Sequence, residues 1–141
     1  MTVDRRGHSV FLTGSDERTG SAHSDMLTAA YTVGKTNSRW VARFDGGGWD
    51  EGVDVVWVPS VRHEVAVTGG SERNGVVGWR TIAYTASTGT RVWSDEYRGP
   101  SKEQGYPRAI TASASGTRIY VVGYTTTARM DDFATVAYRA G

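Results

Sequence analysis

The chain has 141 residues, enough for one ordinary domain, and its 16 basic residues nearly balance its 15 acidic ones. The basic residues are scattered and form no stripe that would follow a phosphate backbone, so we expect no nucleic-acid partner. The sequence contains no cysteine, which excludes disulfides, thiolate metal sites and cysteine nucleophiles.

Residue usage favours strands over helices. There are 17 valines and 17 threonines but only two leucines, and β-branched residues fit a pleated sheet better than a helix. No apolar run approaches the roughly 20 residues of a membrane-spanning helix, so no membrane partner is expected. Residues 1–8 lack the apolar stretch of a signal peptide. We therefore expect an all-β chain that is cytoplasmic as it stands, or extracellular if it is a fragment of a secreted protein.

The first predicted elements are short strands. Residues 2–6 match the end of a strand, and residues 10–14 form an apolar run that ends in glycine. Residues 28–31 lie in an alternating stretch, and residues 40–44 alternate aromatic residues with small or polar ones. Alternation with a period of two places successive side chains on opposite faces of a strand.

The same elements then recur along the chain. In the second copy they lie at residues 53–58, 65–69, 81–84 and 93–97. In the third copy three of them lie at residues 106–112, 119–123 and 135–138. The glycines that close the apolar runs are 55 and 54 residues apart, and the tyrosines of the next strand are 53 and 54 apart. Landmarks that share one period indicate a structural repeat.

Four short antiparallel strands in about 50 residues form the unit of a β-propeller blade. We therefore predict one partial propeller domain over residues 1–141, with about two and a half blades in repeats at roughly 8–52, 53–105 and 106–141. Closed propellers have about 4 to 8 blades, and a terminal blade leaves an apolar face uncovered. Either the chain is a fragment of a longer protein, or several copies close a ring as a homo-oligomer. A β-sandwich is a further alternative, which the repeat period argues against.

Parts of the repeat resemble known propeller families. Residues 83–93, Ala-Tyr-Thr-Ala-Ser-Thr-Gly-Thr-Arg-Val-Trp, resemble the tryptophan-docking motif of pyrroloquinoline-quinone-type propellers, with Thr85 where that motif usually has aspartate. Residues 132–138, Asp-Phe-Ala-Thr-Val-Ala-Tyr, are similar to the Asp-Tyr-Ala-Thr-Ile-Ala-Tyr strand of bacterial propeller-repeat proteins. Kelch-type blades are the second comparison, because a double glycine at residues 69–70, Tyr84 and Trp93 follow one another in the order typical of such blades. These resemblances imply a propeller fold and leave the activity open.

Several repeated residues are predicted to be structural. We expect Trp40 and Trp93 to pack between adjacent blades, because a buried tryptophan contributes a large contact area. The glycines that close the apolar runs are expected to permit turn geometry that other residues resist. The loops after the second and fourth strands of a blade are predicted to be the longer ones and to share one face of the molecule. They span residues 15–25, 46–52, 70–78, 99–105 and 124–131.

No reactive constellation stands out in the sequence. It contains no His-Glu-x-x-His pair and no Gly-x-Ser-x-Gly elbow, and nothing matches the catalytic positions of the quinone enzymes. No cofactor is predicted, and a non-catalytic role is favoured over an enzymatic one. Four carboxylates, Asp45, Asp50, Glu51 and Asp54, gather in one segment, but their spacing fits no calcium motif. We interpret them as a solvated acidic loop, with a cation site as the alternative.

The predicted function is a non-catalytic binding or scaffold module, because loops held by a rigid scaffold commonly carry binding sites. The candidate binding face, at the long-loop end, consists of Trp49, Asp50, Glu51, Glu103 and Tyr106. Its partner would be a protein, a small molecule or a carbohydrate. One alternative is that the two aromatic residues only cover blade edges. Another is that the chain belongs to a larger propeller hydrolase or quinone-type oxidoreductase whose active site lies outside it.

Overall fold

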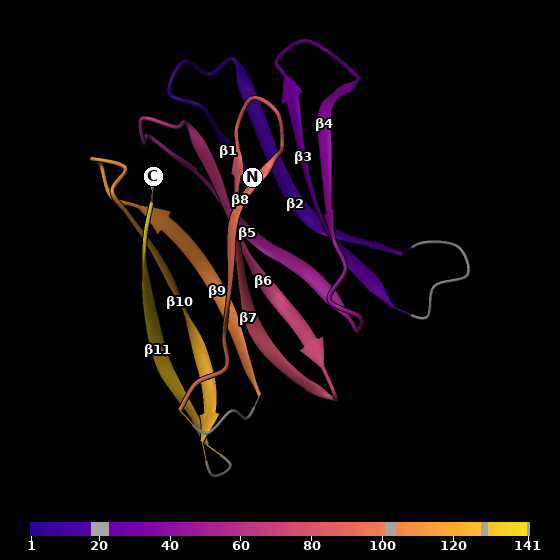
Figure 1. Ribbon diagram of the computed structural model, residues 1–141, viewed down its shortest axis with the longest axis vertical. Coiled ribbons are helices and arrows are strands. Elements are labelled where there is room, and N and C mark those ends of the chain that lie inside the picture. The colour runs from indigo at the N-terminus through magenta and orange to yellow at the C-terminus, as the bar shows by residue number, and fades with distance from the viewer. Residues whose placement is uncertain (18–22, 101–103, 128–129, 141) are drawn as a thin grey trace.

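The computed structural model describes residues 1–17, 23–100, 104–127 and 130–140. These residues are all-β and form eleven strands in three antiparallel sheets. Figure 1 shows the sheets following one another with the chain, from indigo at the N-terminus to yellow at the C-terminus. Within the described residues, no helix is long and apolar enough to cross a membrane.

Each sheet is a meander, in which strands that follow one another in the chain lie side by side. The first sheet contains β1 (Thr2–Val3), β2 (Ser9–Glu17), β3 (Ser24–Thr32) and β4 (Ser38–Phe44). The second contains β5 (Asp50–Val58), β6 (Glu64–Arg73), β7 (Val76–Thr85) and β8 (Arg91–Tyr97). The third contains β9 (Gly105–Ala112), β10 (Arg118–Thr127) and β11 (Met130–Arg139). The predicted all-β class and its sheets of antiparallel strands are confirmed.

The second and third sheets share a bulge at the same place in the repeat. In β5, Val53 is an extra residue, because its two neighbours pair with the adjacent residues Thr68 and Gly69 of β6. In β9, Arg108 is extra in the same way against β10. A bulge bends its strand and increases the local twist. The repeat therefore extends to backbone geometry as well as to residue types.

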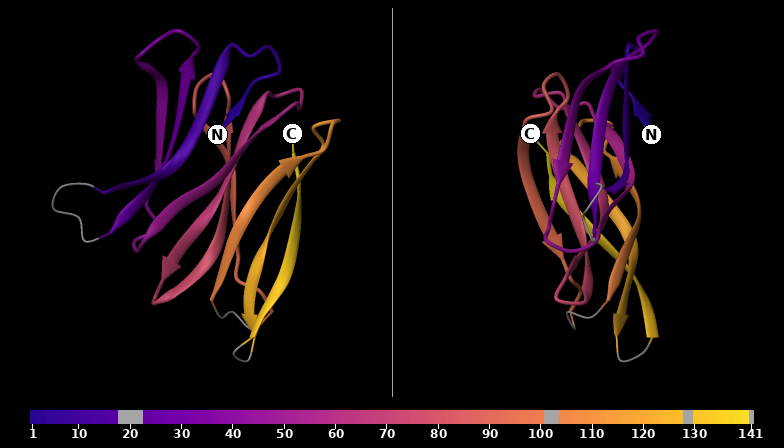
Figure 2. Two further views of the ribbon diagram at one scale, coloured as in Figure 1. Left: turned by 180° about the vertical axis from the view of Figure 1, so that it is seen from behind. Right: turned by 90° about the vertical axis from the view of Figure 1, so that its right-hand side faces the viewer.

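The three sheets stack face to face, and the second lies between the first and the third (Figure 2). Side chains alternate along its strands, so Val65 and Val67 point toward the first sheet while Ala66 points toward the third. The first interface buries Phe11, Met26, Ala30, Val55, Val65, Val67, Ile82 and Tyr84. The second buries Val58, Ala66, Trp79, Ile110, Ile119 and Val121. The core of the molecule consists of these two interfaces, since each sheet must bury an apolar face against a neighbour.

Trp40 and Trp93 lie between consecutive sheets, as predicted. The ring of Trp40, on β4, lies 6.1 Å from that of Tyr84 on β7, centroid to centroid. Its indole N–H donates to the carbonyl oxygen of Ala86 at 2.9 Å. The ring of Trp93, on β8, lies 5.3 Å from that of Tyr138 on β11. Each tryptophan thus joins one repeat to the next.

The glycines at the predicted strand ends do not form turns, and this prediction is wrong. β2, β6 and β10 continue past Gly14, Gly69 and Gly123, and none of the three has a positive φ. A Cβ at Gly69 would lie 1.8 Å from the carbonyl oxygen of Glu51. At Gly123 it would lie 2.2 Å from the carbonyl oxygen of Tyr106. Two of the glycines are therefore required because the bulged neighbouring strand passes so close to them.

The loop predicted at residues 70–78 is also wrong, because the strands run through most of it. Only Asn74 and Gly75 connect β6 to β7, with φ angles of 54° and 76°. Asn-Gly with both φ angles positive favours a tight hairpin turn whose twist matches that of the strands. Parts of the loops predicted at 15–25, 99–105 and 124–131 lie outside the described residues.

Candidate functional site

Three of the predicted binding residues come together where β4 leads into β5. The ring of Trp49 lies 6.3 Å from that of Tyr106, at a tilt of 31°. The Tyr106 hydroxyl donates a hydrogen bond to the Glu51 carboxylate. Burial and this neighbouring carboxylate raise the pKa of Tyr106 above its ordinary value of 10.0, so the hydroxyl remains a donor. All three side chains are half-buried, and part of the surface of each is covered by its neighbours in this cluster.

The two rings of this cluster also cover the second sheet. A Cβ at Gly70 would lie 2.5 Å from the Tyr106 ring and 3.2 Å from the Trp49 ring. The Arg108 guanidinium lies over the Tyr106 ring, 5.5 Å from its centroid. Much of the aromatic surface at this end is therefore in contact with the protein itself. Glu103, the fourth residue predicted here, lies outside the described residues.

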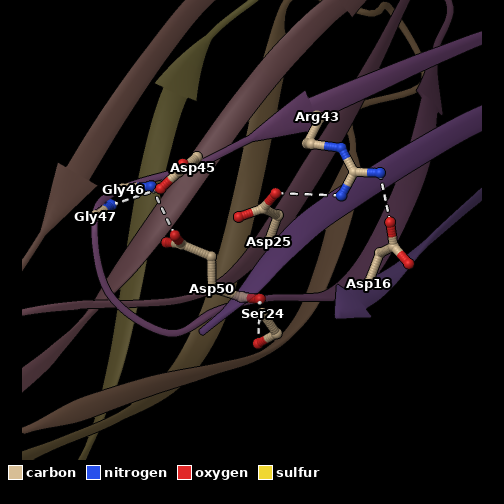
Figure 3. A network of polar contacts seen from close by, with 8 residues as sticks. All are labelled: Asp16, Ser24, Asp25, Arg43, Asp45, Gly46, Gly47 and Asp50. Atoms are coloured by element: carbon tan, nitrogen blue, oxygen red, sulfur yellow. Dashed lines mark hydrogen bonds and ion pairs between the residues drawn. The ribbon is translucent and has the colours of Figure 1, made fainter. Parts of the chain in front are cut away.

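Asp50, the fifth predicted residue, is fully buried at 0% exposure. Its carboxylate accepts a hydrogen bond from the Gly46 N–H at 2.6 Å. The Ser24 hydroxyl donates to the Asp50 backbone carbonyl at 3.1 Å. Figure 3 shows the side chain turned back toward its own loop. Asp50 therefore holds the connection between β4 and β5 in place and offers no surface to a large partner.

The carboxylates of the predicted acidic loop face different partners. Asp45 accepts from the Gly47 N–H at 2.9 Å, and Asp54 accepts from the Ile110 N–H of the third sheet at 3.0 Å. Beside them, the Arg43 guanidinium bridges Asp16 and Asp25, as Figure 3 shows. In the part of the chain that the structure describes, no group of three or more histidine or carboxylate side chains is arranged to hold a metal ion.

Burial raises the pKa of the Asp50 carboxyl above its ordinary 3.8, although hydrogen bonds from Ser71 and Gly46 oppose the rise. The unfolded chain therefore ionises this carboxyl more readily than the folded one, and stability is lost as the pH rises through the ordinary pKa toward the folded one. Asp50→Asn resembles the protonated side chain. We expect its stability relative to the wild type to increase between about pH 3 and pH 7 in urea denaturation. A difference that stays constant with pH would contradict this expectation.

A groove opens at the other end of the sheets, between the first and the second. Its volume is about 700 Å³, within the range of small-molecule sites. The turns that join β1 to β2, β5 to β6 and β7 to β8 surround it. Its cationic residues are Arg5, Arg6 and Arg39, and its apolar surface comes from Phe11, Trp57 and Pro59.

Two side chains give the groove firm walls. The Arg39 guanidinium, from β4, donates to the Ser9 hydroxyl at 3.2 Å and to the Ala86 carbonyl at 2.8 Å, so it spans from the first sheet to the second. The Trp57 ring, from β5, stacks on the His63 ring with 6.3 Å between centroids and 15° between planes. Cationic side chains and a flat aromatic surface that line one groove suit an anion that carries a planar group.

The turn at residues 4–8, between β1 and β2, also lines the groove. Asp4 accepts from the His8 N–H at 2.8 Å, and its own N–H donates to the Ser9 carbonyl at 3.0 Å. Desolvation tends to raise the pKa of the Asp4 carboxyl, but hydrogen bonds from His8 and Ser9 outweigh it and lower the pKa. Asp4 is thus an ionised anchor of the turn. Arg5 and Arg6 make no hydrogen bond or ion pair in the described structure and project from this turn as exposed side chains.

This groove is not predicted by the sequence, because its residues come from four separate segments of the chain. His63 follows His8 by 55 residues in an equivalent turn, but only His63 lines the groove, so this spacing reflects the repeat and does not mark the groove. In the comparisons with known proteins, no family model matches the chain, and no curated protein matches it significantly. The geometry of the molecule is therefore the basis for its proposed function.

Proposed function

We propose that this chain is a β-propeller repeat segment that acts as a binding module. Two features support the propeller. Consecutive sheets of three or four strands stack through equivalent positions, and each tryptophan of a fourth strand packs on the following sheet. The motif of residues 83–93 supports the same class, since its tryptophan packs on the following repeat and its glycine lies against the tryptophan of the preceding one. A Cβ at Gly89 would lie 2.6 Å from the Trp40 ring.

The observation that carries the binding function is the groove between the first two sheets. Three arginines, one aspartate and the apolar side chains of Phe11 and Trp57 line it. We propose that it takes a small anion with a flat apolar part, such as an aromatic carboxylate. The arginines would bind the carboxylate through charge-assisted hydrogen bonds, and Trp57 would pack against the ring.

We expect the double variant Arg5→Gln/Arg6→Gln to bind 2-naphthoate at least about tenfold more weakly than the wild type, in isothermal titration calorimetry. Both side chains are exposed and make no hydrogen bond in the described structure, so the variant is expected to keep the fold. Arg118→Gln/Arg139→Gln is the matched control, because it removes the same charge from exposed positions of the third sheet. Equal weakening in both variants, or no measurable binding by the wild type, would contradict the proposal.

A further inference from the structure

The two outer faces of the stack expose apolar side chains. On the first sheet, Val3 is 51% exposed, Leu12 38% and Val41 53%. On the third sheet, Tyr120 is 38% exposed and Phe133 78%. Both faces lie on the flanks of the molecule, and no element of the described chain covers them (Figure 2). Exposed apolar faces of this kind mark interaction surfaces.

The outer face of the third sheet is built like the face that the first two sheets bury. Phe133 pairs with Tyr124 on the neighbouring strand at the position where, one repeat earlier, Trp79 pairs with Gly70. Trp79 is 0% exposed against the third sheet. Phe133 thus stands uncovered at the place where the preceding repeat inserts its largest side chain into the next sheet.

The outer face of the first sheet is built like the opposite face. Leu12 pairs with Ala29 as Val67 pairs with Ile82 in the second sheet and as Val121 pairs with Val136 in the third. Val67 and Val121 are both 0% exposed, because the preceding sheet packs on them. The first sheet therefore presents the surface that receives a preceding sheet, and the third presents the surface that packs on a following one.

We propose that a second copy of this chain covers both faces, with the third sheet of each copy packed on the first sheet of the other. The chain already forms this contact twice within itself, between its first and second and between its second and third sheets. The partner that fits best is therefore one that repeats the same pair of surfaces. Two copies contribute twice three sheets, or six, which falls in the range of about 4 to 8 sheets found in closed propellers. Each contact joins the third sheet of one copy to the first sheet of the other, and a two-fold axis repeats this contact, so that both faces of both copies are covered in a ring of two.

The test is the molar mass of the full chain across a concentration series, by sedimentation equilibrium. We expect the wild type to have twice the mass of a single chain. Phe133→Glu and Leu12→Glu each place a charge on one of the two surfaces, so each alone is expected to be a monomer. Val61→Glu is the matched control: Val61 is 96% exposed in the turn between β5 and β6, away from both faces, and the variant is expected to remain a dimer.

A mixture of Phe133→Glu with Leu12→Glu tests whether the contact joins different surfaces. Phe133→Glu keeps an intact first sheet and Leu12→Glu keeps an intact third sheet, so the mixture is expected to regain a dimer through one contact. Circular dichroism of each variant checks that its sheets are formed. A wild type that is a monomer at every concentration, a mass that grows without limit, or a mixture that stays monomeric would overturn the proposal.

Discussion

Trp79→Ala is expected to lower the free energy of unfolding by about 3–5 kcal/mol, enough to unfold much of a marginally stable domain. Trp79, on β7, is 0% exposed between the second and third sheets. Its indole N–H donates to the Tyr124 carbonyl at 3.0 Å, and its ring meets that of Tyr97 edge-on at 5.1 Å between centroids. The side chain thus fixes the third sheet to the second by packing and by a directed hydrogen bond.

The cavity that Trp79→Ala would leave cannot readily be filled by movement of its surroundings. A Cβ at Gly105 would lie 3.0 Å from the indole nitrogen, and one at Gly123 would lie 2.8 Å from the ring. Part of the wall is therefore backbone of β9 and β10, which moves less readily than side chains, and a cavity that cannot collapse costs more.

Urea denaturation followed by circular dichroism measures the loss. Trp79→Phe keeps a ring but loses the hydrogen bond to Tyr124, so we expect an intermediate effect. Val61→Ala, at a side chain 96% exposed, is expected to stay within about 0.5 kcal/mol of the wild type. If Trp79→Ala were as mild as Val61→Ala, the second interface would not hold the third sheet as described.

Periodicity in the sequence was sufficient to predict the sheets, because residues at equivalent positions meet equivalent surroundings. Trp40 and Trp93 were placed correctly between repeats for this reason. The end of each strand was harder to predict. Gly69 and Gly123 resemble turn residues in the sequence, and only the close approach of a bulged strand shows why they are glycines.

The candidate site was less predictable than the fold. Trp49, Glu51 and Tyr106 come together as their places in neighbouring repeats suggested, but Asp50 turns inward, and the alternation of a strand does not reveal which loop side chain is buried. The groove depends on side chains such as Arg6 that project from a turn, where no period relates residue type to position. The repeat period predicts which faces of the sheets pack against one another. A groove formed between turns depends on contacts between distant segments, which the period does not reveal.

Gly69→Ala is expected to destabilise the protein by about 1–3 kcal/mol, although it adds only one methyl group. That methyl group would lie 1.8 Å from the Glu51 carbonyl oxygen and 2.7 Å from the end of the Met26 side chain. Met26 can move, but the carbonyl belongs to the bulged strand β5, which pairs with β6 along its whole length. Relief would require β5 to shift and the ladder at the bulge to break.

Gly14→Ala is the matched control for Gly69→Ala, since the two glycines occupy the same position in consecutive repeats. A Cβ at Gly14 meets nothing within 4 Å, and no bulged strand passes against it: β1 pairs only with Phe11 and Val10 of β2. Without a positive φ at this position, alanine is expected to stabilise the protein by about 0.4–1 kcal/mol by restricting the unfolded chain. Opposite signs for the two variants in urea denaturation would show that the bulged strand, rather than any preference of the strand itself, requires glycine. Equal changes in the free energy of unfolding would mean that a backbone feature shared by both repeats requires glycine, and would contradict a role for the close approach of β5 to Gly69.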